Sequence, residues 1–281
     1  MRSLHNVLAP AKLNLFLHIT GRRDDGYHLL QSVFMLIDWC DTLHFDVRDD
    51  GVIEREDLNV VLPADDLVMR AAQSLQRASG TPLGVHIAIE KYIPAQAGMG
   101  GGSSDAATTL LALNRLWGLN WPLSKLMPLG LALGADVPFF LSGHNAWIEG
   151  IGEQITPIDV PAARFAVVKP NAGLETAKIF RAPELQRATE TATMPFFAAN
   201  PYGFGRNDLQ PVAQALCPEI TEAIQWLGSF GLSPRMTGSG SAVFAQLPDG
   251  VLIDSAPHNW QMRICSNMAV HPQAGWAASE S

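Results

Sequence analysis

A run of four glycines and two serines lies between Gly98 and Ser104. Neighbouring glycines let successive backbone N–H groups converge without interference from a Cβ atom, so the run predicts an anion-binding nest. The residues that follow, Ser103–Leu119, carry a Ser-Asp cap signal, an Ala/Leu-rich stretch and a terminal glycine, which predict a helix. The positive end of that helix would point at the nest and favour a di- or triphosphate. A tight strand-to-helix turn is the structural alternative for the same glycines.

The amino-acid sequence of this loop does not match several common motifs. None of the five lysines follows a glycine, so the GxxxxGK[ST] loop of the common nucleoside triphosphatases is absent. The sixth position counted from Gly98 is Ser103, so the dinucleotide fingerprint fails as well. The sequence also lacks GxSxG, HExxH and CxxC. The loop therefore predicts phosphate binding without identifying the ligand.

Two charged residues outside the loop are candidates for catalysis. Lys12 lies in an apolar, strand-like segment, where a charge is costly unless it has a partner or a function. Asp136 follows a helical run and precedes Val137 and Pro138, a position at which a carboxylate often serves only as a cap or turn residue. An exposed strand-end lysine and a capping aspartate remain the structural alternatives.

The elements that must position these residues mix helices with short strands. Residues 85–93 alternate apolar with polar side chains, which predicts a half-buried strand immediately before the loop. Apolar residues recur at helical spacing from Leu67 to Ala78, between an acidic cap at 65 or 66 and Gly80. Shorter strands are predicted at 14–19 and 42–47.

The C-terminal half is also predicted to be mixed. Residues 165–169 and 242–246 indicate strands, and 218–230 indicate a helix that ends at a glycine. Residues 181–207 are polar and rich in Pro and Gly, which predicts a long irregular connection or a set of short helices. We expect a frayed tail beyond His271. The predicted domains are residues 1–158 and 159–281.

The composition limits the class of protein. At 281 residues with 47% hydrophobic residues, the chain is long enough for two cores. A net charge of −8 argues against nucleic acid as a partner, because binding to its backbone relies on clustered Lys and Arg. Three widely spaced cysteines favour free thiols in a reducing compartment over disulfides or zinc ligands. No secretory signal or membrane-spanning run is evident, so we expect a cytoplasmic protein with no membrane partner.

At this point five segments together resemble a known family. The phosphate loop PAQAGMGGGSSDAA resembles that of the GHMP kinases, which include galacto-, homoserine, mevalonate and phosphomevalonate kinases. Within this family the resemblance is to the kinases that act on 4-diphosphocytidyl-2-C-methyl-D-erythritol. It is carried by the loop and by four further segments: APAKLNLFLHI (Ala9–Ile19), GRRDDGYHLLQSVF (Gly21–Phe34), GADVPFF (Gly134–Phe140) and TGSGSAVFA (Thr237–Ala245).

The resemblance implies an α+β fold of two domains. The N-terminal α/β domain would carry the phosphate loop, the C-terminal domain would be ferredoxin-like, and the active site would lie in the cleft between them. ATP with Mg²⁺ would phosphorylate the 2-hydroxyl of the methylerythritol moiety, in the non-mevalonate route to isoprenoids. Lys12 and Asp136 would act as a catalytic unit that activates this hydroxyl. A monomer or weak homodimer is expected.

The resemblance also implies a nucleotide site. ATP would contact Leu67, Lys91 and the whole loop: Pro94, Ala95, Gln96, Ala97, Gly98, Met99, Gly100, Gly101, Gly102, Ser103 and Ser104. Ser104, or its neighbour, could offer a hydroxyl to Mg²⁺ or to a phosphate oxygen, with helix capping as the alternative. Asp66 stands where related enzymes have an asparagine, so a contact between its side chain and adenine is left open.

At the opposite end the resemblance implies a site for the cytidyl group. Tyr27 and Phe180 would stack on the pyrimidine and His28 would hydrogen-bond its edge. Asn14 would contact the methylerythritol hydroxyls, and the loop with Gly238 and Ser239 would close near the substrate phosphates. From the residues alone, a core phenylalanine, a loop histidine, a strand amide and a simple turn are the alternatives.

Two other functions fit part of the pattern. A homoserine or mevalonate-type kinase would share the glycine loop but not the segments at 9–19 and 21–34. A nucleotide-binding homologue without turnover is the alternative from a different class. The presence of both Lys12 and Asp136 argues against it.

Overall fold

The computed structural model describes residues 2–257 and 260–279, and its N-terminal part is built on a six-stranded sheet. The strand order is β3-β4-β2-β5-β6, and β1 pairs with β2 off this path. All pairs are antiparallel except that of β3 with β4. The strands are β1 (Ser3–Arg22), β2 (His28–Arg48), β3 (Ile53–Asp57), β4 (Gly84–Glu90), β5 (Ala146–Glu149) and β6 (Gln154–Pro157).

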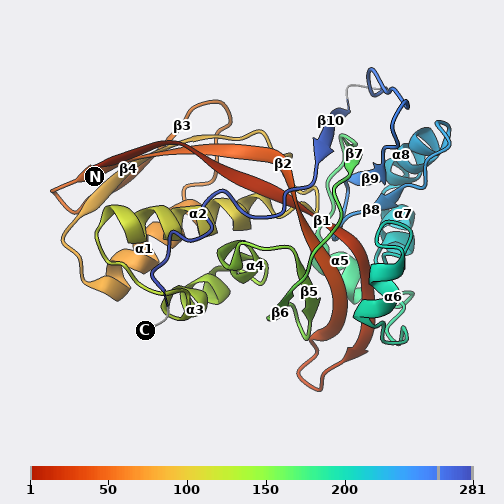
Figure 1. Cartoon of the computed structure of the whole chain (residues 1–281), viewed down its shortest axis with the longest axis horizontal. Coiled ribbons are helices and arrows are strands. Elements are labelled where there is room, and N and C mark those ends of the chain that lie inside the picture. The colour runs from red at the N-terminus through yellow and green to blue at the C-terminus, as the bar shows by residue number, and fades with distance from the viewer. Residues whose placement is uncertain (1, 258–259, 280–281) are drawn as a thin grey trace.

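Four helices lie on one side of this sheet (Figure 1). They are α1 (Leu67–Ser79), α2 (Gly101–Leu116), α3 (Leu123–Leu133) and α4 (Val137–Ser142). Helix α2 is buried along most of its length, and it packs with α1, α4 and the strands around Phe45 and Ile87 in one hydrophobic core. Because α2 begins at the phosphate loop, this core fixes the direction in which its N-terminus points.

The C-terminal part has its own antiparallel sheet, in the order β10-β7-β9-β8, and its own core. The strands are β7 (Arg164–Lys169), β8 (Arg235–Met236), β9 (Val243–Gln246) and β10 (Gln261–Ser266). The helices are α5 (Thr176–Arg181), α6 (Met194–Ala199), α7 (Gln210–Leu216) and α8 (Pro218–Gly228). The chain thus leaves the first sheet at Pro157 and enters the second at Arg164, while the division at 158 stays a prediction.

The long strands β1 and β2 join the two parts (Figure 1). The first half of β1 packs over the helices of the N-terminal core, whereas Leu17 and Ile19 belong to the C-terminal core. Leu17 also bridges to Asn207 of the C-terminal part. The strands predicted at 14–19 and 42–47 are therefore pieces of two much longer strands, each of which spans regions of different burial.

The capping residues in the sequence predict both ends of α1 correctly, but they do not predict the start of α2. Asp66 caps α1 by accepting a hydrogen bond from the Met69 amide, and Gly80 ends the helix in the left-handed conformation, as predicted. The predicted Ser-Asp cap of α2 is wrong. The helix begins at Gly101 after Gly100, whose φ is 72°, and no side chain caps it. The glycines thus form the helix terminus itself, and both serines lie in its first turn.

The expectation of a frayed C-terminal tail is wrong for residues 272–279, while residues 280 and 281 lie outside the described part of the chain. After β10 the chain crosses back to the N-terminal part, where His271 donates its amide to Gly143 and Ala278 donates to Trp121. His271 and Gln273 are buried, and the Arg115 guanidinium lies 5.2 Å from the Trp276 ring. The tail therefore packs on the helical layer, although its small and polar residues resemble a linker.

Candidate active site

Three cavities share walls along the junction of the two parts. The phosphate loop lines a cavity of ≈ 550 Å³, and Tyr27, His28 and Phe180 line another of ≈ 600 Å³. Between them lies a cavity of ≈ 280 Å³ that contains Lys12 and Asp136. It shares Gly98, Gly100, Thr176 and Ser239 with the first cavity, and it shares Leu30, Ile151 and Phe180 with the second. Apart from Ser104, the candidate residues therefore line one continuous set of cavities.

The phosphate loop presents free backbone donors to the first cavity. The first helical hydrogen bond of α2 runs from the Ser104 amide to the Gly100 carbonyl at 2.9 Å. The amides of Gly101, Gly102 and Ser103 precede that bond, so they have no carbonyl partner within the helix. They stand at the positive end of a 16-residue helix. Residues 94–103 all line this cavity, and their contact with ATP stays a prediction.

The loop is joined to the C-terminal glycine turn by close backbone contacts. A Cβ on Gly98 would lie 2.3 Å from the Thr237 carbonyl oxygen, and one on Gly238 would lie 2.6 Å from the Gly98 carbonyl oxygen. The amides of Ser241 and Ala242 donate to the carbonyls of residues 96 and 97 at 3.1 and 3.2 Å. Gly238 and Ser239 accordingly line the middle cavity. The turn therefore forms part of the cavity wall, while its role near the substrate phosphates stays a prediction.

Lys12 and Asp136 face each other in the middle cavity. Lys12 Nζ lies 3.6 Å from Asp136 Oδ2, and the lysine side chain is 4% exposed whereas the aspartate is 33% exposed. Asp136 immediately precedes α4 but makes no side-chain capping bond, so the capping alternative is wrong. Burial lowers the pKa of Lys12, and the charge of Asp136 only partly opposes this shift. The lysine is therefore a buried cation that has one accessible carboxylate.

Polar neighbours on β1 and β2 hold Lys12 in place. Its Nζ donates to Asn14 Oδ1 at 2.5 Å and lies 4.5 Å from the centre of the Phe34 ring. Asn14 Nδ2 in turn donates to Ser32 Oγ, and the Asn14 amide donates to Thr237 Oγ1. Asn14 lines the middle cavity, but its side chain already hydrogen-bonds Lys12 and Ser32, and its contact with the methylerythritol hydroxyls stays a prediction. It orients the lysine.

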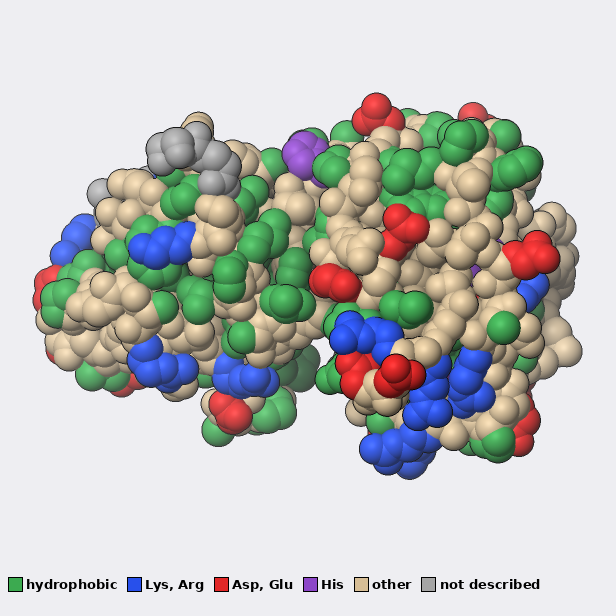
Figure 2. Space-filling model, turned by 90° about the horizontal axis from the view of Figure 1, so that it is seen from below, with side chains coloured by type: hydrophobic (Ala, Val, Ile, Leu, Met, Phe, Trp, Pro, Cys, Tyr) green, Lys and Arg blue, Asp and Glu red, His purple; other side chains and the backbone are tan. Residues whose placement is uncertain are grey.

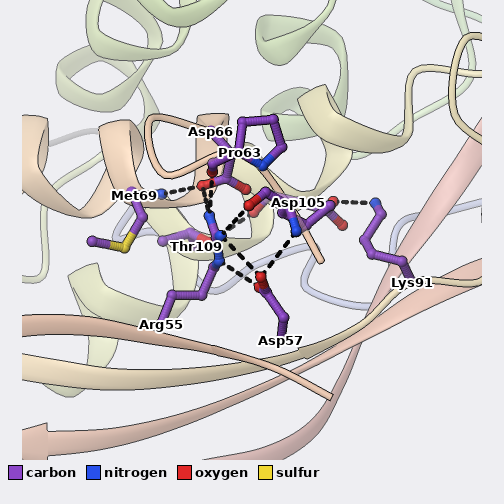
Figure 3. Close-up of polar contacts among 9 residues, drawn as sticks. Arg55, Asp57, Pro63, Asp66, Met69, Lys91, Asp105 and Thr109 are labelled. Atoms are coloured by element: carbon purple, nitrogen blue, oxygen red, sulfur yellow. Dashed lines mark hydrogen bonds and ion pairs between the residues drawn. The ribbon is translucent and has the colours of Figure 1, made fainter. Parts of the chain in front are cut away.

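A second lysine lies at the base of the nucleotide cavity. Lys91 Nζ pairs with both Asp41 and Asp105, and the latter contact is drawn in Figure 3. Burial by itself would lower the pKa of Lys91, but the two carboxylates outweigh burial and raise it. Burial raises the pKa of Asp105 above its ordinary value, the charge of Lys91 opposes this rise, and the charge of Asp41 adds to it. Lys91 lines the cavity with its ammonium already engaged.

Next to this lysine, Asp66 is engaged by an arginine. Arg55 Nη1 lies 2.6 Å from Asp66 Oδ1, the same oxygen that caps α1, and Arg55 Nε donates to Asp57 (Figure 3). Arg55 also donates to the carbonyls of Leu62 and Pro63, which line the cavity with Leu67. The carboxylate that replaces the family's amide is thus balanced by an arginine and shapes the cavity wall.

The third cavity combines aromatic rings with charge. The rings of His28 and Phe180 are 5.1 Å apart, and Tyr27 is 61% exposed beside them. Arg22, Arg181 and Arg187 outnumber Asp25 among the charged residues that line this cavity. Figure 2 shows a group of Lys and Arg side chains, with a few Asp and Glu side chains among them, next to the narrow region between the two halves of the molecule. An aromatic, cationic cavity suits a base that carries a diphosphate.

The proposed metal ligand occupies an unexpected position. The Ser104 side chain is fully buried, and its Oγ has no hydrogen-bond partner within the described residues. Ser103, the alternative that the sequence left open, lines the nucleotide cavity, whereas Ser104 lies behind it. Within residues 2–257 and 260–279, no group of three His, Cys, Asp or Glu side chains could hold a metal ion.

Sequence reasoning missed three residues of the site. Thr176 lines two of the cavities and its Oγ1 lies 2.7 Å from Ser239 Oγ. It precedes Phe180 by four residues on α5, so helical spacing could have indicated it. Asp41 contacts Lys91, which is 50 positions away in the sequence, and Arg187 contacts His28, which is 159 positions away. Local sequence patterns cannot indicate contacts between residues so far apart.

Family models match both parts of the chain. The model of the GHMP kinase N-terminal domain matches residues 66–144, and that of the C-terminal domain matches residues 196–260. The chain belongs to the GHMP kinases. It is therefore a kinase with the two-domain α+β fold of that family, as the sequence predicted. No helix in the described part of this kinase is both long and apolar enough to cross a membrane.

Curated relatives and solved structures extend this result. This GHMP kinase is 68% identical over 280 residues to the 4-diphosphocytidyl-2-C-methyl-D-erythritol kinase of Albidiferax ferrireducens, covering 100% of this chain and 98% of that protein. It is 62% identical to the enzyme of that name from Variovorax paradoxus, covering 99% and 100%. A crystal structure of 4-(cytidine 5'-diphospho)-2C-methyl-D-erythritol kinase matches with a TM-score of 0.73 at 36% identity, covering 85% and 88%. The homoserine kinase of Cytophaga hutchinsonii shares the fold alone, with a TM-score of 0.69 at 15% identity and 96% coverage of both chains.

Proposed function

We propose that this chain transfers the γ-phosphoryl group of ATP to the 2-hydroxyl of 4-diphosphocytidyl-2-C-methyl-D-erythritol, giving the 2-phosphate and ADP. One observation carries the proposal: the cavity with Lys12 and Asp136 lies between a phosphate-binding cavity and an aromatic, cationic one. Relatives that carry this enzyme name match over the full chain. The product belongs to the non-mevalonate route of isoprenoid synthesis.

The nucleotide cavity binds and orients the triphosphate. The amides of Gly101, Gly102 and Ser103 face the phosphates, and these donors need no reorganisation because the buried helix α2 fixes them. The apolar wall around Leu67 and Pro94 suits the face of the adenine base. Lys91 holds the base of the cavity through its two carboxylate partners.

The middle cavity activates the acceptor hydroxyl. Asp136 is the accessible carboxylate, so it is placed to accept the proton of a hydroxyl that enters between it and Lys12. The Lys12 ammonium stabilises negative charge that develops on the attacking oxygen, and Asn14 keeps the ammonium pointed at that position. Phosphoryl transfer asks little more of the protein than this positioning and charge neutralisation.

The site fits Mg²⁺ as an ion carried by the nucleotide. Ser103 offers a hydroxyl oxygen in the nucleotide cavity and Asp136 a carboxylate in the middle cavity, whereas the Ser104 oxygen is fully buried behind the loop. That set is too small to hold the ion alone, and Mg²⁺ is usually bound by one or two protein groups plus phosphate oxygens. When bound, Mg²⁺ would neutralise charge on the β- and γ-phosphates.

The aromatic cavity holds the remote end of the acceptor. Tyr27 and Phe180 offer faces for the cytosine ring, while the surrounding arginines offset the charge of the diphosphate. Gly238 and Ser239 line the middle cavity, and Ser239 also lines the nucleotide cavity, so this turn stands near the phosphates of both ligands. We further propose that the enzyme acts in the cytoplasm as a monomer or weak homodimer, which light scattering on the purified protein would test.

A competition between acceptors tests the function. With ATP and Mg²⁺ present, the purified protein is expected to phosphorylate the cytidyl acceptor and to ignore homoserine and mevalonate. Phosphorylation of either of these without turnover of the cytidyl acceptor would overturn the substrate assignment. Binding of ATP without turnover of any acceptor would instead support a non-catalytic homologue.

A further inference from the structure

The Arg187 guanidinium next to the aromatic cavity uses all five of its N–H donors. Four of them reach backbone carbonyls at the end of α5 and in the segment after it, and the fifth, on Nε, donates to His28 Nε2 at 3.2 Å. The carbonyl acceptors belong to Phe180, Ala182, Pro183 and Leu185. Because guanidinium has five donors in a rigid plane, this set of bonds allows a single orientation.

That bond determines which nitrogen of His28 carries the hydrogen. Arginine can only donate, so Nε2 must accept with its lone pair, and a neutral imidazole then has its one N–H on Nδ1. Burial lowers the pKa of His28, and the charges of Arg187 and Arg22 lower it further, so the ring stays neutral. In the described part of the chain no group hydrogen-bonds Nδ1, and His28 lines the cavity.

We propose that Arg187 is a positioning residue that makes His28 a fixed Nδ1–H donor, and that this donor selects cytosine over uracil in the acceptor. Cytosine presents a lone pair at ring nitrogen N3, whereas uracil presents an N–H there. A fixed N–H on Nδ1 of His28 can donate a hydrogen bond to the lone pair of cytosine N3, whereas it faces another N–H in uracil. This inference rests on the proposed function, because it takes the cavity as the site of the pyrimidine.

The tautomer can be measured in the protein without ligand. Long-range ¹H–¹⁵N correlation spectra report whether each imidazole nitrogen is protonated, and the His28 signals are assigned by their loss in His28→Gln. The expected result is a protonated Nδ1 and an unprotonated Nε2. A protonated Nε2 would overturn the proposal. This measurement needs no substitution at Arg187, so it holds even if changes there prevent folding.

A pair of arginine substitutions tests the consequence for binding. Arg187→Met removes the donor to Nε2, and Arg181→Met removes a charge from the same cavity without a bond to His28. Calorimetry with CDP and UDP as probes is expected to show a preference for CDP in the unaltered protein. Arg187→Met should reduce that preference by about tenfold, the worth of one hydrogen bond of roughly 1.4 kcal/mol.

The control should behave differently. Arg181→Met is expected to weaken CDP and UDP alike and to leave their ratio unchanged, because only the charge of the cavity falls. If Arg187→Met altered the His28 tautomer but left the ratio of CDP to UDP affinity unchanged, the proposal that His28 selects cytosine would be rejected. Failure of the proposed function is separate: it would appear as absent turnover of the cytidyl acceptor, whatever the tautomer of His28.

Discussion

Two lysines of the site line different cavities, Lys12 the middle cavity and Lys91 the nucleotide cavity, and have contrasting surroundings. Lys12 has a single carboxylate at 3.6 Å, partly open to solvent, and burial lowers its pKa. Lys91 is held by two carboxylates that are almost completely buried, and they raise its pKa. The residue types are the same, but the number and exposure of the partners differ.

This difference separates a reactive group from a supporting one. A lysine whose charge is incompletely compensated can interact strongly with new negative charge, such as that on an attacking oxygen. A lysine between two buried carboxylates has little left to offer a ligand, but its removal would leave those carboxylates unpaired. We therefore expect substitutions at Lys12 to affect turnover and those at Lys91 to affect stability.

The largest effect is expected at the reactive centre. Asp136→Asn keeps the size of the side chain but removes its ability to accept a proton, so kcat should fall by about 10²- to 10⁴-fold. Lys12→Met should lower kcat to a similar degree, and the dissociation constant for ATP should stay within about threefold in both. Steady-state kinetics and calorimetry measure these quantities. A kcat near that of the unaltered enzyme would remove the residue concerned from the mechanism.

The next effect concerns folding. Lys91→Met leaves Asp41 and Asp105 buried without their cation, which should lower the free energy of unfolding by about 3–5 kcal/mol. Lys12→Met is the matched control, because its partner Asp136 can remain hydrated. Urea denaturation of both variants measures the difference. If Lys12→Met were the more destabilised of the two, the contrast between the lysines would be reversed.

A third effect depends on pH. Burial and the charge of Asp41 raise the pKa of Asp105 above its ordinary value of 3.8, so in the acidic range between the unfolded and the folded pKa the folded state binds more protons than the unfolded chain. The contribution of Asp105 to the free energy of unfolding should therefore fall as the pH rises through that range. Asp105→Asn removes the titration, and denaturation at several pH values should give a shallower decline. If the free energy of unfolding fell equally with pH in both proteins, the pH dependence would come from a group other than Asp105.

The smallest effect is expected for an exposed pair. Lys178 lies 2.9 Å from Glu175, but both side chains are 64% exposed. Because such pairs contribute little, Lys178→Ala should shift the melting temperature by less than about 2 °C. A larger shift, measured by calorimetric scanning, would show that proximity outweighs burial among the lysines of this protein.

Much of the site could be predicted because its parts are short and contiguous. The phosphate loop, the segment around Lys12 and the residues before α4 each carry their chemistry within a few positions. Asp41 could not be recognised as a partner of Lys91, because the contact depends on the pairing of β2 with β4. The start of α2 was misplaced because a glycine terminus uses backbone conformation, whereas the cap signal assumes a side chain. The tail was misjudged because its order comes from the surface that it covers.

The seam between the phosphate loop and the C-terminal glycine turn limits how the two lobes can move. Gly98 and Gly238 meet backbone to backbone, and two amide bonds from residues 241 and 242 close the same seam. Because these contacts are between backbone atoms, no change of side-chain rotamer can relieve them. We therefore expect the phosphate loop and the glycine turn to stay together, so that the wall shared by the nucleotide cavity and the middle cavity keeps its shape.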